Sequence, residues 1–156
     1  MTNIFFPDEK ITENDLYFLC YMIERISRRL KQHNNYVVNA IPADKWRHLI
    51  SLASTLHSEN PLQVEDDWIS EYNLVSGNFD ITDINPNMET KIPSDLQMGK
   101  VYMRLIIDTM LPEEDYIDAM IRVYNNEICT VIDNYDCGAY YEPSYFIARA
   151  YYNGGF

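Results

Sequence analysis

The sequence has only three cysteines, Cys20, Cys129 and Cys137, and they fit no metal-binding or redox pattern. An odd number without regular spacing is a poor disulfide framework. Without a C-x-x-C pair, zinc and iron–sulfur sites are disfavoured. The Glu-x-x-His pairs of a di-iron bundle are also missing. We therefore expect the protein to bind no metal and no cofactor.

A leader peptide and a membrane-spanning run are missing as well. The first ten residues, MTNIFFPDEK, have neither a basic start nor an apolar stretch. The longest apolar runs fall far short of the roughly 20 residues that cross a bilayer. We expect a reduced, cytoplasmic protein that does not enter a membrane.

Motifs of catalysis and of nucleotide binding are absent too. The chain contains no G-x-x-x-x-G-K-[ST], G-x-G-x-x-G or G-x-S-x-G pattern. His48 and His57 lie nine residues apart, which places them on nearly opposite faces of one predicted helix, and His33 lies in a separate loop. A structural role is favoured for His57, although its imidazole is also a candidate for contact with a ligand. No feature of the sequence therefore indicates an enzyme.

Basic residues are scarce, with 12 Lys and Arg against 24 Asp and Glu, for a formal net charge of −12. Because phosphate contacts need Lys and Arg, this balance argues against nucleic-acid binding and against docking on an anionic membrane. Residues 1–50 carry six acids and seven bases, a net of +1, whereas residues 51–156 carry eighteen acids and five bases, a net of −13. The acidity is interpreted first as a solvated surface and second as a face for a basic partner.

What the sequence does have is helical periodicity. Apolar residues spaced three and four apart predict helices at 13–31, 42–57, 61–73, 94–110, 112–135 and 143–152, with a further helical turn near 36–41. Residues 75–93 are rich in Gly, Asn, Asp and Pro and carry no helical period. The predicted fold is an all-α, compact bundle of six or seven helices in two packed halves, 1–74 and 94–156. Residues 75–93 connect the halves, and we expect a single domain.

Capping patterns mark two of the predicted helix starts. Thr12 with Asp15, and Ser94 with Gln97, have the spacing of a capping box. The expected buried face of the first helix is Leu16, Leu19, Ile23, Ile26 and Leu30. In the helix after Pro61, the acids at 65–67 are expected to face solvent.

A basic cluster lies near the end of the first helix, formed by Arg25, Arg28, Arg29 and Lys31. Such a cluster either holds a phosphate-bearing ligand or pairs with acids elsewhere in the chain, of which there are many. Arg25 and Arg29, together with His57, are the candidate ligand-binding residues.

The last 22 residues, YDCGAYYEPSYFIARAYYNGGF, are the most aromatic stretch of the chain. Helical numbering places Tyr145, Ala148 and Tyr152 on one stripe that is expected to dock on the bundle. Large rigid side chains such as Tyr are typical interface anchors. The candidate partner-binding residues are Tyr140, Tyr151, Tyr152, Phe156, Asp133 and Asp136, of which Tyr151, Tyr152 and Phe156 are the strongest candidates for an exposed patch.

Residues 14–73 also resemble a known family. The stretches LYFLCYMIERISRRL and WRHLISLASTLHSENPLQVEDDWISEY are similar to a family of short bacterial helical proteins of unknown function. Many of its members are encoded beside a putative ADP-ribosyltransferase-like toxin. The resemblance implies a component of a toxin–antitoxin or defence-like gene pair, with a neighbouring toxin as a possible protein partner.

Two main functions stay open at this point. The first is a non-enzymatic, antitoxin-like interaction module whose acidic, tyrosine-rich surface covers a protein partner. The second is a small-molecule-modifying enzyme or sensor with a site between the helical halves. A DNA mimic is a third and weaker option, since it requires acids spaced like phosphates along one face.

Overall fold

The computed structural model describes residues 1–87 and 91–156. Within these residues all regular structure is helical, apart from an isolated bridge between Thr2 and Lys10. The predicted all-α class is therefore confirmed. The helices are α1 (Glu13–Leu30), α2 (Asn34–Ala40), α3 (Ala43–Ser51), α4 (Ala53–Leu56), α5 (Pro61–Glu71), α6 (Asp95–Thr109), α7 (Tyr116–Tyr124), α8 (Cys129–Ile132), the 3₁₀ helix η1 (Ala139–Tyr141) and α9 (Ser144–Asn153).

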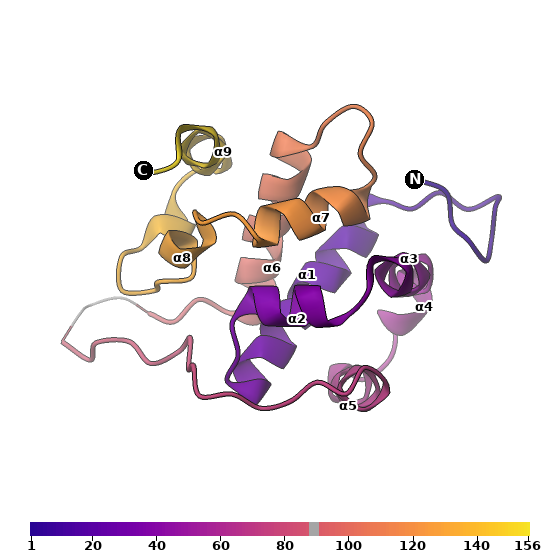
Figure 1. Ribbon diagram of the computed structural model, residues 1–156, viewed down its shortest axis with the longest axis horizontal. Helices are drawn as coiled ribbons and strands as arrows, with labels where there is room; N and C mark the ends of the chain where they lie inside the picture. The colour runs from indigo at the N-terminus through magenta and orange to yellow at the C-terminus, as the bar shows by residue number, and fades with distance from the viewer. Residues whose placement is uncertain (88–90) are drawn as a thin grey trace.

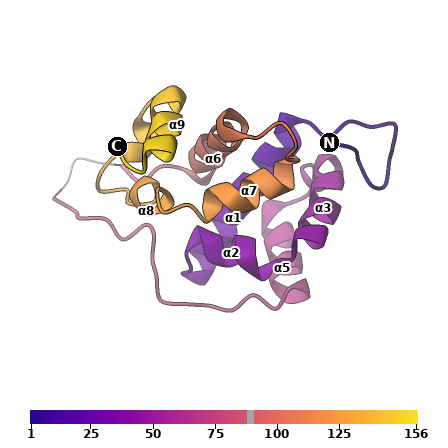
Figure 2. The same ribbon diagram turned by 45° about the horizontal axis from the view of Figure 1, so that its top comes forward.

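Helix α1 is the centre of the fold. It contacts α2, α3, α4, α5 and α6, and its longest contact is with α6, which runs beside it (Figures 1 and 2). The five residues of the predicted apolar stripe are all buried, and so are side chains on its other faces, among them Phe18, Cys20, Met22, Glu24 and Ser27. An amphipathic surface helix has one buried stripe. Helix α1 is instead enclosed on most of its circumference.

The approach of α6 to α1 depends on Gly99. A Cβ added at Gly99 would lie 2.9 Å from the backbone nitrogen of Tyr21 and 3.0 Å from its Cα. These are backbone atoms of a buried helix, which cannot move aside without shifting the helix itself. Glycine is therefore required where the two helices cross.

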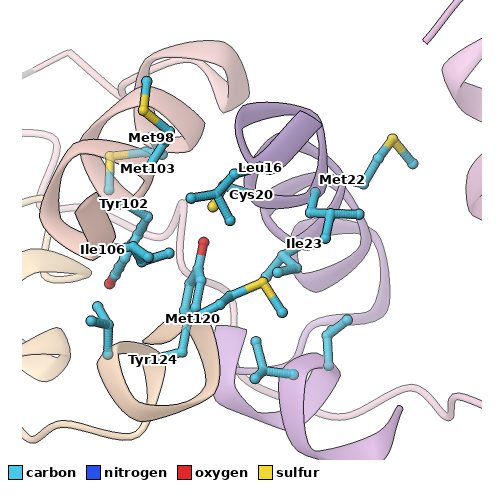
Figure 3. Packing of buried hydrophobic residues seen from close by; sticks show 14 of the residues in the cluster. Leu16, Cys20, Met22, Ile23, Met98, Tyr102, Met103, Ile106, Met120 and Tyr124 are labelled. Carbon is cyan, nitrogen blue, oxygen red and sulfur yellow. The ribbon is translucent and has the colours of Figure 1, made fainter. Parts of the chain in front are cut away.

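One hydrophobic core joins the two halves of the chain. Figure 3 shows Tyr124 reaching from α7 toward α1, with its hydroxyl pointing toward Cys20. The rings of Tyr124 and Tyr102 are stacked, with centroids 4.3 Å apart. Buried residues of α1, α3, α5, α6, α7 and α9 belong to the same cluster. The two predicted halves therefore share a single interior.

The two helix starts predicted from capping patterns are confirmed, and two predicted long helices are wrong. The backbone N–H of Thr12 donates to Asp15 Oδ2 (2.8 Å), and the N–H of Gln97 donates to Ser94 Oγ (3.0 Å). The stretch 42–57 is two helices, α3 and α4, with a break at Leu52. The helix predicted at 112–135 begins only at Tyr116, ends at Tyr124, and is followed by the short α8.

The second break has a local cause. The side chain of Asn126 accepts a hydrogen bond from the backbone N–H of Ile128 (2.9 Å), which favours a turn over a continuing helix. These breaks raise the number of α-helices in residues 1–87 and 91–156 to nine, above the predicted six or seven.

The connection between α5 and α6 passes around the outside of the molecule, below α2 and past α8 (Figures 1 and 2). Its start is held at the end of α1, because the N–H groups of Gly77 and Phe79 donate to the carbonyls of Leu30 (2.8 Å) and Lys31 (2.9 Å). No strand forms at 79–84. Residues 88–90 of the predicted segment lie outside the described part of the chain.

No helix in the described ranges 1–87 and 91–156 is both long enough and apolar enough to cross a membrane.

Candidate functional site

The predicted partner-binding aromatics fall into two groups. Tyr152 is 65% exposed and Phe156 is 48% exposed. Tyr140 is buried, and its hydroxyl donates to the carbonyl of Lys91 (3.1 Å), so the prediction that it faces a partner is wrong. Tyr151 is partly buried, and its hydroxyl accepts from Arg122 Nη1 (2.6 Å).

Helix α9 is rotated relative to its prediction. Of the stripe expected to dock on the bundle, Ala148 is buried, together with Ile147 and Ala150, whereas Tyr145 and Tyr152 are exposed. Small alanine side chains let α9 lie close against α6, which larger tyrosines would prevent. As a result, the C-terminal segment presents what we call the aromatic surface, formed by Tyr141, Tyr145, Phe146, Tyr152 and Phe156. Phe146 and Phe156 stack with ring centroids 6.3 Å apart.

The candidate ligand-binding residues do not form a common open site. Arg25 forms ion pairs with Glu65 (2.9 Å) and Asp95 (3.2 Å), and Arg29 pairs with Asp66 (2.6 Å). These arginines are therefore occupied by carboxylates of the same chain.

Two related side-chain positions also differ from the prediction. Glu65 was expected to face solvent, but it is buried beneath Arg25, which neutralises it. His57, for which a structural role was favoured, is exposed, with its ring 5.5 Å from that of Phe18.

Part of the uneven charge of the sequence is neutralised by ion pairs within the fold. Bases of the first 50 residues pair with acids further along the chain, as in Arg25–Asp95, Lys31–Asp80 (3.0 Å) and Arg47–Asp115 (2.9 Å). Each of these pairs connects the first helices to the connecting segment or to the C-terminal half. Part of the acidity of residues 51–156 thus assembles the protein itself.

A buried polar cluster lies at the C-terminal end of α1. Glu24 is only 1% exposed, and its carboxylate accepts from Arg28 Nε (2.7 Å), Tyr135 Oη (2.8 Å) and Asn34 Nδ2 (3.2 Å). Arg28 also donates to the carbonyl of Pro93 (2.7 Å). Buried charges need such partners, because desolvation would otherwise cost several kcal/mol. The cluster ties α1, α2 and the segment after α8 together.

Asp133 is the second carboxyl of this cluster. It accepts hydrogen bonds from the Tyr102 hydroxyl and from Asn34 Nδ2 (3.3 Å). Burial, reinforced by the nearby charge of Glu24, raises the pKa of Asp133 to about 8. Asp133 is therefore partly buried and belongs to this network. Asp136 accepts from the backbone N–H of Asn85 (2.8 Å) and thereby holds the connecting segment.

A cavity of about 440 Å³ opens beside this cluster. Its walls come from residues 33–35 at the start of α2, residues 79–84 of the connecting segment, the end of α7, α8, and residues 133–136. It therefore lies between the two predicted halves. Tyr124, Asp133 and Tyr135 belong both to its lining and to the interior described above.

Two of the three thiols are buried and are therefore unreactive at neutral pH. Burial raises the pKa of Cys20 and of Cys129 to about 12, so each remains a thiol at neutral pH. Cys137 is exposed. In the described ranges, no three His, Cys, Asp or Glu side chains are grouped closely enough to hold a metal ion.

The central members of the cluster were not found from the sequence. Glu24, Arg28, Asn34, Tyr102 and Tyr135 come from distant positions, and the available signal was the spacing of four between Glu24 and Arg28 on one helix. No protein family model matches the chain, and neither a curated protein nor a solved structure matches it. Its function is therefore inferred from its own residues.

Proposed function

We propose that the protein is a non-enzymatic protein-interaction module that binds a basic protein partner through the aromatic surface. The observation that carries this proposal is the exposure of five large aromatic side chains on and around a single well-packed helix. Exposed fractions reach 79% at Tyr141 and 67% at Tyr145. Rigid aromatic side chains bury much area for little loss of conformational entropy, which makes them frequent energetic centres of interfaces.

Helix α9, which carries three of these five side chains, is well packed against the core. Ile147, Ala148 and Ala150 pack against the core, and Gly154, with φ of 77°, ends α9 in a left-handed conformation. The aromatic surface is thus held in place before a partner arrives, so little ordering entropy opposes binding.

The net negative charge of the chain favours a basic partner. A net charge of −12 attracts a basic protein and repels an acidic one, which raises the association rate and makes it dependent on salt. On the resemblance of residues 14–73, the first candidate is the toxin encoded by a neighbouring gene, which would make the protein antitoxin-like.

The test compares two double variants in binding to the purified neighbouring-gene product. Tyr145→Ser with Tyr152→Ser removes two rings of the aromatic surface. Ile4→Ser with Phe6→Ser removes two large apolar side chains that are also exposed, at 54% and 50%, near the start of the chain. We expect the first double variant to weaken binding at least roughly tenfold and the second to leave it within about twofold.

Circular dichroism and urea unfolding establish that both variants are folded. If the neighbouring-gene product does not bind, or binds both double variants as it binds the unaltered protein, the aromatic surface is not the interface.

A further inference from the structure

The cavity beside α8 has a strongly acidic lining. Its carboxyl-bearing residues are Asp80, Asp83, Glu127, Asp133 and Asp136, and no lysine or arginine is among its described lining residues. Asp80 is paired with Lys31. Asp83 and Glu127 are exposed and belong to no ion pair within residues 1–87 and 91–156. An anionic ligand would be repelled from such a cavity, and a cationic one attracted.

Asn34 adds an independent observation. It lines the cavity, is only 2% exposed, and its Oδ1 has no hydrogen-bond partner among the described residues. The orientation of its amide is fixed, because Nδ2 donates to the carboxylate of Glu24 (3.2 Å) and to a carboxyl oxygen of Asp133 (3.3 Å). A flipped amide would place oxygen against oxygen. An acceptor buried without a donor is unfavourable, so this site lacks a hydrogen-bond donor.

Three aromatic rings also line the cavity. Phe79, Tyr124 and Tyr135 line the cavity together with the acids, and Phe79 is stacked on His33 with centroids 3.7 Å apart. A cation that lies against such rings gains from their quadrupoles, most strongly where water is excluded. The volume of about 440 Å³ falls in the range of small-molecule sites.

We propose that this cavity binds an organic cation through an ammonium or guanidinium group. Such a group brings positive charge to the acidic lining and N–H donors to a wall that is rich in acceptors. None of the residues of the aromatic surface lines the cavity, so the site is independent of the proposed protein interaction.

Binding of a cation at this site is coupled to the loss of a proton from Asp133. The charged and titratable groups around it are Glu24, Arg28, Tyr102, Tyr124, Cys129 and Tyr135. Burial and Glu24 raise its pKa to about 8, so near neutral pH it carries a proton in the empty protein. A cation placed beside Asp133 favours its carboxylate form, and binding therefore releases this proton.

The experiment is calorimetric titration of the full chain with putrescine and, as a neutral molecule of the same length, 1,4-butanediol. We expect saturable binding of putrescine at one site, proton release at pH 7 detected in buffers of different ionisation enthalpy, and no binding of butanediol. Butanediol binding as well as putrescine, or no saturable putrescine binding up to about 10 mM, would overturn the proposal. Binding without proton release places the cation away from Asp133 and contradicts it too.

Matched variants separate the site from the general acidity of the chain. Asp83→Asn with Glu127→Gln removes two charges from the lining, and Asp108→Asn with Glu113→Gln removes the same two residue types from exposed positions elsewhere. We expect the first pair to weaken putrescine binding at least roughly tenfold and the second by less than about twofold. Equal effects of the two pairs would show only bulk attraction and would overturn the proposal.

A second arm identifies the source of the cation. A capped peptide, Gly-Gly-Lys-Gly-Gly, is compared with the same peptide carrying norleucine in place of lysine. Tight binding of the lysine peptide assigns the site to a basic side chain of another protein, and binding of putrescine without the peptide assigns it to a free amine. Both results support a cation site.

Discussion

The hydroxyl of Tyr135 donates a 2.8 Å hydrogen bond to Glu24 across 111 positions of the chain. Tyr135 is only 1% exposed and its ring lies 5.6 Å from the Arg28 guanidinium. The first aromatic residue of the C-terminal stretch is thus part of the interior, and its hydrogen bond stabilises a buried carboxylate in the C-terminal half of α1. Aromatic residues at the start of the C-terminal stretch thus pack in the interior, whereas those at its end are exposed.

Replacing Tyr135 by Phe removes this hydrogen bond and keeps the ring. We expect the free energy of unfolding to fall by about 1.5–3 kcal/mol, as for a hydrogen bond to a buried charged group. Urea unfolding measures it. Tyr141→Phe is the control, since Tyr141 is exposed and its change should stay within about 0.5 kcal/mol. Equal stabilities of the two variants would contradict a structural role for the Tyr135 hydroxyl.

Asp133 should make stability depend on pH. Its folded pKa of about 8 lies above the ordinary carboxyl value of 3.8. Between these values the folded state holds a proton that the unfolded state has released. Stability therefore falls as pH rises from about 4 to 8, by up to about 1.4 kcal/mol per unit from this group.

The variant Asp133→Asn has no proton to lose at this position. We expect its unfolding free energy to fall less steeply between pH 5 and pH 8 than that of the unaltered protein. Asp83→Asn, at an exposed position, should retain the original slope. Parallel curves for Asp133→Asn and the unaltered protein would show that Asp133 titrates normally.

Gly99→Ala should destabilise the protein although alanine favours helices. The added Cβ would meet backbone atoms of Tyr21 at 2.9–3.0 Å, and we expect a net cost of about 1–3 kcal/mol from overpacking. Gly155→Ala is the control, because nothing lies within 4 Å of its added Cβ. Thermal unfolding compares them. An unchanged or raised Tm for Gly99→Ala would mean that α1 and α6 can separate without loss.

The thiols should differ sharply in reactivity. Cys137 is exposed, whereas Cys20 and Cys129 are buried with pKa values of about 12. An aromatic disulfide reagent is expected to modify one thiol per chain rapidly in the native protein and all three in denaturant. Cys137→Ser should abolish the rapid phase. Rapid modification of a second thiol would show that the interior around α1 or α8 opens readily.

Local signals predicted the helix starts well. The pairs Thr12–Asp15 and Ser94–Gln97 act within one turn, so their hydrogen bonds depend on little else. The break at Leu52 was not visible, because the apolar residues on both sides of it pack on the same core and preserve the period. The break after Tyr124 had a signal in Asn125–Asn126, which the strong apolar period outweighed.

Side-chain direction was harder to predict than helix position. Glu65 was expected to face solvent because of its charge, yet it is buried because Arg25 of α1 neutralises it. Tyr145 was expected to face the core on the same stripe as Ala148, yet only Ala148 does so, together with Ala150. In each case the outcome depends on a partner far away in the sequence, which periodicity within one helix does not contain.

The position of α1 has a consequence for synthesis of the chain. Helix α1 leaves the ribosome well before α6 and before Tyr135, the partner of Glu24 that lies 111 positions further along the chain. Until they are made, α1 exposes apolar side chains on several faces and a carboxylate without its tyrosine. Contacts so distant in sequence form late, and their surfaces are prone to aggregate before they close.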